Sequence, residues 1–366
     1  MSKPSNRRVA ALIFTSLFIS SVAFSQFNNV DFLRSAPADA VKFVQAYISP
    51  WANAFGAGLN GSWYNTAKPH KLGGFDVTAS FNVGMVPSSA GTFDVTKIGL
   101  SSALSATGAG SGTTSSISGP NKQGPQMAYK SGAYTLATFN TPPGTNWKYI
   151  PVPMVQVGIG LPLGTELKVR FLPKISIKGG DVSMWGVGLM HSIMQYIPGN
   201  KLLPLDASIF VGYTRLTGNV PISLQPDGSV TQNYTTIVPL TYFSNQNLNA
   251  IVEALNISAI GSVNLKIITF YAGLGYSKTK TSVKLQGYFP APVLVASGTP
   301  HVEYNDIAGS GSIKTGDEFS KMKIENFSGL RANAGFRIKL AVITIFADYT
   351  RAQYNVVSTG LGISFR

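Results

Sequence analysis

The chain has no cysteine, and it has few charged residues. Without cysteine there are no disulfides, no thiolate catalysis, no iron–sulfur clusters, no cysteine-based zinc site and no lipid-anchor cysteine of a bacterial lipoprotein. Charged residues make up 12% of the 366 residues, half the roughly 25% that is usual in soluble globular proteins. A solvated charged shell is therefore hard to build, and a water-soluble enzyme is not expected.

Long apolar runs are also missing beyond the first 25 residues, so the sequence predicts no transmembrane helix in the mature chain. At the start, Lys3, Arg7 and Arg8 precede an apolar run, and Ala23 and Ser25 supply the small residues of a cleavage site. We predict a signal peptide over residues 1–25 and Sec-type export. An uncleaved anchor is the alternative, but the uncharged stretch is short for a span of ~20 residues. A mature chain in a membrane would have to be a closed barrel.

An apolar–polar alternation points the same way. From Phe75 to Met85, six apolar residues alternate with five polar or small ones, which gives a strand with one apolar face. The same period recurs in residues 166–171, 205–214, 330–338, 343–349 and 357–365. Such segments are typical of an integral outer-membrane β-barrel of a Gram-negative cell. A soluble β-sandwich is the alternative, but its strands would be shorter and its wet face richer in Lys and Glu.

The connections predict how the barrel is oriented. If the last strand ends in the periplasm, the long Gly- and Ser-rich segments near 101–145, 216–245 and 286–326 all fall outside, where bacterial barrels carry their long loops. We predict an all-β, antiparallel barrel of about 12 strands, or 14 if Gln126–Phe139 forms another wall hairpin. An N-terminal helical or hatch segment precedes it.

Charged residues on the polar faces are candidates for the lumen, because a charge facing lipid is costly. They form either a polar path or an internal salt-bridge network that stiffens the wall. These lumen-lining candidates are Asp76, Glu166, Lys168, Arg170, Asp206, Arg331, Arg337 and Asp348.

The segment between the signal peptide and the first clear strand is the second candidate for function. We divide the chain into the signal peptide 1–25, an N-terminal helix and hatch 26–74, and the barrel 75–366. Residues 38–48 predict a short amphipathic helix that ends before Pro50, and a Gly-rich aromatic run follows it. A barrel this wide needs a plug or leaves a channel. Residues 53–63 are equally compatible with a first wall strand. The hatch candidates are Val41, Val44, Ile48, Gly58, Asn65, Thr66 and Ala67.

Motifs for catalysis or cofactors are missing from the sequence. His70, His191 and His301 have no metal-ligand spacing, so we interpret them as isolated surface residues and expect no metal site. The GxGxxG match at Gly56–Gly61 has no βαβ context, and there is no P-loop or GxSxG elbow. We expect no enzyme activity and no cofactor. The net charge of +14 is scattered along the chain, which speaks against a nucleic-acid partner.

Two stretches carry a resemblance to known proteins. Residues 62–70 (SWYNTAKPH) and 185–193 (WGVGLMHSI), with Pro198-Gly199 and the strand that ends at Thr214, resemble an uncharacterised family of Bacteroidota outer-membrane barrels. More remotely, the layout is similar to the FadL-type fatty acid transporters, whose 14-stranded barrel holds an N-terminal hatch with an Asn-Pro-Ala motif. Asn65-Thr66-Ala67 is the nearest match here, with Thr in place of Pro.

The resemblance implies passive uptake of small hydrophobic or amphipathic molecules. The alternative function is an accessory or scaffold barrel within a larger outer-membrane complex. Phe365, one residue from the terminus, resembles the assembly signal of outer-membrane proteins, which implies the barrel-assembly machinery as a partner. The other expected partners are outer-membrane lipid, lipopolysaccharide and other outer-membrane proteins.

Overall fold

A computed structural model describes residues 37–107, 112–177, 180–197, 204–225, 234–236, 240–290, 292–295, 301–304, 312–314 and 322–365. The predicted signal peptide and residues 26–36 lie outside the described residues. No helix in the described part of the chain is long and apolar enough to cross a membrane.

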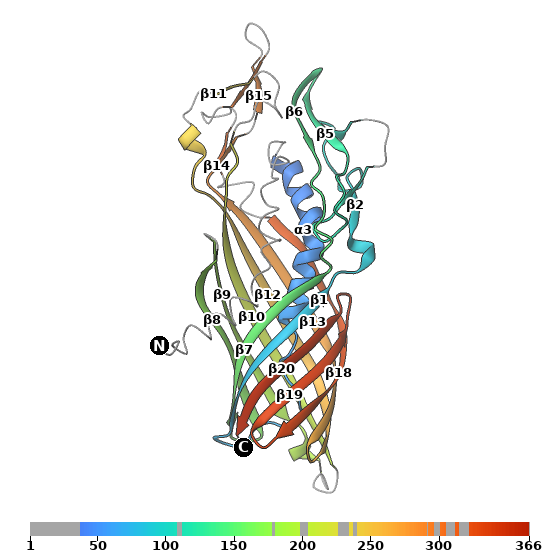
Figure 1. Cartoon of the computed structure of the whole chain (residues 1–366), viewed down its shortest axis with the longest axis vertical. Coiled ribbons are helices and arrows are strands. Elements are labelled where there is room, and N and C mark those ends of the chain that lie inside the picture. Colours follow the sequence, from blue (N-terminus) through green and yellow to red (C-terminus); the bar gives the residue numbers. More distant parts are fainter. Residues whose placement is uncertain are drawn as a thin grey trace, which may run out of the picture.

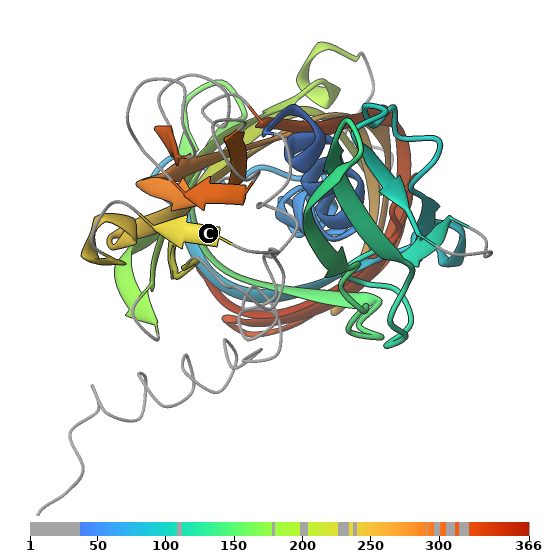
Figure 2. The same cartoon turned by 90° about the horizontal axis from the view of Figure 1, so that it is seen from above.

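Ten antiparallel strands close into a barrel around one helix (Figures 1 and 2). The sheet order is β1-β20-β19-β18-β13-β12-β10-β9-β8-β7, and β1 pairs with both β20 and β7. The predicted all-β antiparallel barrel is thus confirmed, with ten strands rather than 12 to 14. The strands are β1 (Phe75–Met85), β7 (Tyr149–Leu161), β8 (Thr165–Ile177), β9 (Gly180–Ser192), β10 (Leu205–Ile222), β12 (Gln246–Leu265), β13 (Ile268–Gln286), β18 (Met322–Leu340), β19 (Ile343–Arg351) and β20 (Val356–Phe365).

The two barrel ends differ in their connections. At the turn end, which holds Phe75 and Phe365, the connections 162–164, 193–204, 266–267 and 341–342 are all short. At the opposite end, which we call the loop end, residues 86–148, 223–245 and 287–321 form the long connections. The predicted placement of all long segments on one side is confirmed.

The long connections explain the lower strand count, because they build small sheets above the wall instead of wall strands. The hairpin predicted at Gln126–Phe139 exists as β5 (Gln126–Ser131) and β6 (Tyr134–Asn140), but it pairs with β3 (Leu104–Ala106) outside the barrel. Its apolar side chains Met127 and Phe139 are buried against the internal helix rather than turned toward lipid. The other small strands are β2 (Thr92–Asp94), β4 (Thr113–Ser115), β11 (Tyr234–Thr236), β14 (Tyr288–Pro290), β15 (Pro292–Val295), β16 (His301–Tyr304) and β17 (Ser312–Lys314).

The outer surface of the wall is apolar, and the inner surface is polar. On β1, Phe75 and Val77 are 42% and 44% exposed, whereas Asp76 and Thr78 are 7% and 3% exposed. A soluble protein has its apolar side chains inside and its polar ones outside, and this wall has the reverse. The reverse order also holds along β13, where Phe270, Leu274 and Tyr276 face outward. An apolar exterior on a closed sheet is the surface that a lipid bilayer requires.

A charge placed on this outer surface is expected to destabilise the barrel. We expect Leu274→Arg, at a position that is 71% exposed within the apolar outward part of β13, to cost about 2–4 kcal/mol of unfolding free energy in lipid vesicles. Gln286→Arg, on the same strand at the loop end, is expected to cost about 0–1 kcal/mol. Urea unfolding in vesicles measures both, and equal costs would contradict the lipid-facing assignment of Leu274.

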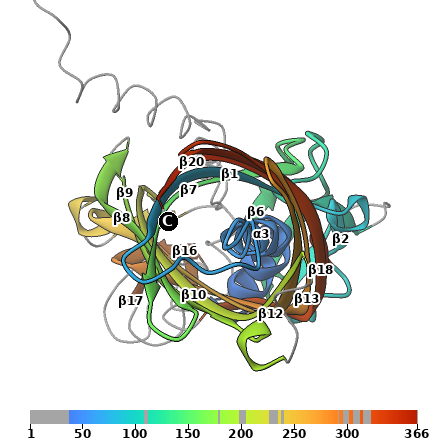
Figure 3. The same cartoon turned by 90° about the horizontal axis from the view of Figure 1, so that it is seen from below.

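The internal helix α3 (Pro37–Leu59) enters from the loop end and reaches the middle of the lumen (Figures 1 and 3). The predicted end before Pro50 is wrong, and so is the alternative wall strand over 53–63, since residues 53–59 are helical. Proline removes one backbone hydrogen bond from a helix. Here Ala52, Ala54, Ala57 and Leu59, which follow Pro50, are buried inside the barrel, so tertiary packing stabilises the helix beyond the proline.

Candidate functional site

The hatch, whose described residues are 37–74, lies in the lumen and packs against the wall both along α3 and along the segment that follows it. Val44 and Ile48, two of its candidate residues, are buried, and Val41 packs half-buried against the same apolar cluster. That cluster joins α3 to loop-end residues such as Ile117 and to wall residues such as Leu285. The predicted apolar face of the helix therefore contacts both the wall and the long first loop.

Glycines permit the close approach of α3 to the wall. A Cβ on Gly58 would lie 3.2 Å from the Cβ of Val152 on β7, and a Cβ on Gly56 would lie 3.0 Å from the Cβ of Thr279 on β13. On the wall side, a Cβ on Gly84 would collide with the backbone of Ala54. The GxGxxG match at 56–61 thus serves helix-to-wall packing.

Two buried arginines from opposite parts of the wall hold the C-terminus of α3. Arg170 of β8 donates to the carbonyl oxygens of Leu59 at 2.8 Å and Gly61 at 2.7 Å, and its guanidinium stacks 3.5 Å from the ring centroid of Trp63. Arg331 of β18 donates to the intervening carbonyl of Asn60 at 2.8 Å. A helix C-terminus carries a partial negative charge and unpaired carbonyls, so these cations satisfy both needs.

Beyond the helix, residues 60–74 run to the turn end and form hydrogen bonds with side chains of the wall. The Tyr64 hydroxyl donates to Asn333 at 2.7 Å, and the Ala67 amide donates to the Ser262 hydroxyl at 3.0 Å. The hatch candidates Asn65 and Thr66 also contact the wall: Asn65 accepts from Arg337 at 3.3 Å, and Thr66 lies 3.4 Å from Ser262. These contacts draw on several strands, so the segment is fixed on all sides.

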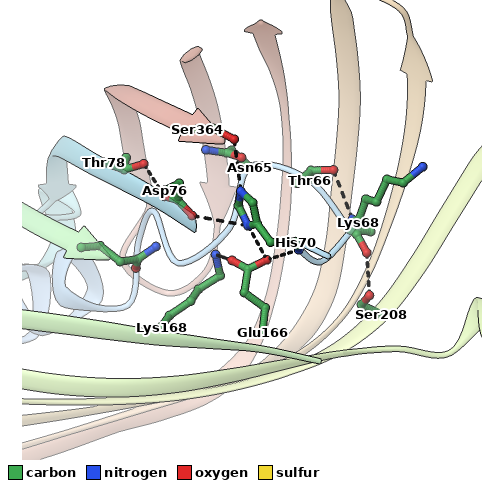
Figure 4. A network of polar contacts seen from close by, with 12 residues as sticks. Asn65, Thr66, Lys68, His70, Asp76, Thr78, Glu166, Lys168, Ser208 and Ser364 are labelled. Carbon is green, nitrogen blue, oxygen red and sulfur yellow. Dashed lines mark hydrogen bonds and ion pairs between the residues drawn. The ribbon is translucent and has the colours of Figure 1, made fainter. Parts of the chain in front are cut away.

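A buried ionic cluster closes the turn end of the lumen (Figure 4). His70 lies with Nδ1 2.9 Å from Glu166 Oε2 and 3.7 Å from Asp76 Oδ1, and its backbone amide donates to the same Glu166 oxygen at 2.8 Å. Its Nε2 lies 3.1 Å from the Ser364 hydroxyl. Lys168 is ion-paired with the other oxygen of Glu166. The prediction that His70 is an isolated surface residue is wrong, because it is 5% exposed.

The cluster brings together three groups that metal ions favour. One ligand atom each from His70, Asp76 and Glu166 lies within 4.8 Å of the others, and all three residues are buried. Lys168 already neutralises the carboxylate of Glu166. The cluster therefore joins the hatch to strands β1, β8 and β20 through ion pairs and hydrogen bonds. The gap beside it measures about 10 Å³, roughly the room of one water molecule.

The remaining lumen-lining candidates are spread around the inner wall. Asp348 accepts from the Tyr271 hydroxyl at 2.9 Å, and Asp206 is bonded to Asn264 and lies 3.9 Å from Lys68. His191, predicted to lie on the surface, sits at the turn-end rim, where its Nδ1 is 2.8 Å from the Thr165 hydroxyl. The side chain of His301 lies outside the described residues.

A larger cavity of about 690 Å³ opens at the loop end, along one face of α3. Lys42, Ser49 and Asn53 of the helix line one side of it. The rest of the lining includes Phe93 and Ile98 of the first loop, Phe327 of β18, and Tyr354 of the connection between β19 and β20. This cavity mixes apolar and polar groups and has the size of a site for a small organic molecule.

The wall has a seam between β7 and β8 that the sequence reading missed. The two strands pair only from Gln156–Arg170 to Leu161–Thr165, although residues 149–155 and 171–177 are all described. Above this point β7 stays paired with β1, while β8 follows β9 and curves away from β7 (Figure 1). The wall is therefore open between the upper halves of β7 and β8.

Prolines account for the seam. The Lys148 carbonyl accepts from Val86, and the Gly160 amide donates to Gly74, so the even-numbered residues of β7 bond toward β1. Backbone groups of an antiparallel strand alternate between its two neighbours. Pro151 and Pro153 therefore occupy positions that face β8, where they have no N–H to donate.

Apolar side chains close the seam from inside. Val152 and Met154 of β7, and Leu172 and Met184 of β8 and β9, form one buried cluster with Leu59 of α3. Phe55, one helical turn earlier, packs on the same cluster. At this seam, side chains of the hatch replace the missing backbone ladder.

Residues 4–365 match the model of a family described as a family of unknown function, DUF6588. No curated protein matches the chain. The solved structures that it resembles include the attachment invasion locus protein Ail of Yersinia pestis (6% identity, 80% of this chain and 98% of that chain, TM-score 0.24). They also include the outer-membrane protease OmpT of Escherichia coli (8% identity, 79% of this chain and 97% of that chain, TM-score 0.30). A third is a FadL homologue of Pseudomonas aeruginosa (10% identity, 85% of this chain and 96% of that chain, TM-score 0.22). Likenesses this weak carry no information on activity.

Proposed function

The chain belongs to the DUF6588 family of unknown function, and we propose that it is an integral outer-membrane barrel that admits small hydrophobic or amphipathic molecules passively. The proposed role is transport and not catalysis. The observation that carries it is the seam between β7 and β8, which is closed by apolar hatch side chains instead of hydrogen bonds.

The contacts favour a sideways route over an axial one. At the turn end, the hatch is fixed by the His70 cluster and leaves a gap of about 10 Å³. At the seam, by contrast, side-chain packing such as that of Phe55 and Leu59 against Val152 stands between the lumen and the lipid-facing side, where the β7–β8 ladder is missing. Displacing apolar side chains breaks no backbone hydrogen bond, so an apolar molecule can pass there at low cost.

The helix α3 stands between the loop-end cavity and the seam. Lys42, Ser49 and Asn53 face the cavity, whereas Phe55 and Leu59 face the seam. In the proposed route, a molecule enters the cavity from the loop end, α3 shifts, and the molecule leaves through the seam into the bilayer. The barrel needs no energy source, because the molecule moves down its own gradient.

A reversible cross-link tests whether α3 must move. The chain has no cysteine, so Gly58→Cys with Val152→Cys introduces the only thiols. Their Cβ atoms would lie 3.2 Å apart, close to the ~3.5–4.5 Å of a disulfide. We expect the oxidised protein in liposomes to take up a fluorescent apolar probe at least about tenfold more slowly than the wild type, with recovery on reduction. The reduced form of the double variant and Val152→Cys alone are the controls, and both are expected to keep most of the uptake, because neither places a new Cβ against the Val152 methyl groups.

A second cross-link separates two ways of opening. Gly56→Cys with Thr279→Cys ties α3 to β13, on the wall away from the seam. Block by both disulfides indicates movement of the helix, whereas block by the first alone indicates movement of β7. If oxidised and reduced forms take up the probe equally, or if the wild type takes up none, the uptake proposal fails. The occluded accessory barrel would then be the better interpretation.

A further inference from the structure

The outward face of β10, β12 and β13 changes character toward the loop end. Along β13, the outward residues Phe270, Leu274 and Tyr276 are followed by Lys278, Lys280 and Lys284, all exposed. Along β10, Val211 and Tyr213 are followed by Arg215. An apolar band bordered by aromatic residues marks the edge of the bilayer core. These cations therefore begin where the lipid headgroups lie.

The four cations form one patch rather than four separate charges. Arg215 and Lys280 flank the same cross-strand neighbour, Glu253, at 3.5 Å and 4.0 Å. Lys278 and Lys284 lie on the same face, opposite Leu255 and Asn249 of β12. Among the described side chains, Glu253 is the carboxylate that contacts these four cations. The four positive charges exceed its one negative charge, so the patch has a net positive charge.

Hydrogen bonding also orders the patch at its lower border. Glu253 accepts from the Tyr213 hydroxyl at 2.7 Å as well as from Arg215. This arrangement fixes the carboxylate in the row of Arg215 and Lys280, whereas Lys278 and Lys284 are exposed on either side of that row. Lysine amines on a flexible stem suit phosphate oxygens as point charges.

We propose that this patch, made of Arg215, Lys278, Lys280 and Lys284, binds the phosphate groups of a phosphorylated glycolipid of the outer leaflet, of the lipid A class. The location at the loop-end border of the apolar band favours a lipid over a soluble anion. The inference rests on the proposed outer-membrane placement, but it does not depend on uptake through the seam.

Lipid binding to the purified full-length protein in detergent tests the assignment. Bisphosphorylated lipid A carrying a fluorophore is the probe, and the same lipid with its phosphates removed is the comparison. We expect Lys278→Gln, Lys280→Gln and Lys284→Gln together to weaken binding of bisphosphorylated lipid A at least about tenfold. The phosphate-free lipid is expected to bind the wild type as weakly as the intact lipid binds this variant.

Matched variants show whether the positive charge of this patch is responsible for lipid A binding. Lys97→Gln, Lys122→Gln and Lys130→Gln remove the same charge from exposed positions in the first long loop and are expected to leave binding within about twofold. Three Lys→Arg changes in the patch are expected to preserve binding, which also guards against misfolding of the glutamine variant. Wild-type affinity in the glutamine variant, equal binding of phosphate-free lipid, or displacement by equimolar inorganic phosphate would each overturn the proposal. None of these outcomes affects the cross-linking test of uptake.

Discussion

Arg170→Met is expected to release the C-terminus of α3 from the wall. Arg170 is fully buried and supplies the donors for the carbonyls of Leu59 and Gly61. Methionine keeps much of the volume but leaves both carbonyls without these donors, at ~1–3 kcal/mol for each unsatisfied group. The expected loss is about 2–5 kcal/mol in the free energy that holds the hatch in place, together with larger single-channel conductance in planar bilayers.

A larger single-channel conductance distinguishes release of the hatch from a general loss of barrel stability. Arg351→Met, which replaces an exposed arginine at the loop end of β19, is the matched control and is expected to behave like the wild type. Protease cleavage within residues 59–64 provides a second measurement, since the segment is buried when it is bound. A folded Arg170→Met barrel with unchanged conductance and unchanged protection would show that Arg331 and packing are sufficient to hold the hatch.

Six of the ten wall strands were predictable, because the wall separates two environments. A strand with lipid on one side and a polar hatch on the other must alternate at every residue, and Phe75–Met85 does so from end to end. The hairpin at Gln126–Asn140 does not join the wall, because its apolar residues Met127 and Phe139 face a buried helix instead of lipid. An apolar side chain in a strand does not by itself tell whether it faces lipid or a protein core.

The sequence also contains a signal for the seam. Pro151 and Pro153 stand two residues apart in an otherwise apolar strand, and proline at alternate positions removes donors on one edge only. The residues that close the seam were not readable in this way. Leu59 and Phe55 reach Val152 and Met154 only because α3 continues through Pro50, and local propensity argues against that continuation.

The His70 cluster shows the limit of spacing arguments. Asp76 follows His70 closely, but Glu166 lies 96 residues and Ser364 lies 294 residues after His70. They meet because barrel closure places β1 between β20 and β7, and β7 pairs with β8. Charged residues on the inner faces could be listed from periodicity. Which of them form pairs depends on the register of the closed sheet, and the sequence pattern does not fix that register.

Deletion of Leu361–Arg366 is expected to abolish assembly of the barrel. The described residues removed pair with β1 from Phe75–Phe365 to Ala79–Leu361, and they pair with β19 at Ile343–Ile363. Without them, the turn-end half of β1 loses its neighbour in the closing ladder and β19 becomes an open edge. Unpaired backbone groups facing hydrocarbon cost several kcal/mol each, so an open sheet cannot remain in the bilayer. Heat-modifiable, protease-resistant barrel in outer membranes is the measurement, with an expected fall to background.

A milder variant distinguishes two causes of the expected assembly defect, which are loss of a recognition signal and loss of the β1–β20 hydrogen-bond ladder. Phe365→Ala keeps the backbone of β20 but removes the ring that lies 5.1 Å from the ring of Phe75. If Phe365 is recognised by the barrel-assembly machinery, this variant is expected to insert poorly in cells and yet fold like the wild type from urea into lipid vesicles. Because its ladder is intact, normal insertion in cells would assign the whole deletion effect to barrel closure. Poor folding in both settings would instead assign the effect to the ring contact between Phe75 and Phe365, which joins the first and last strands.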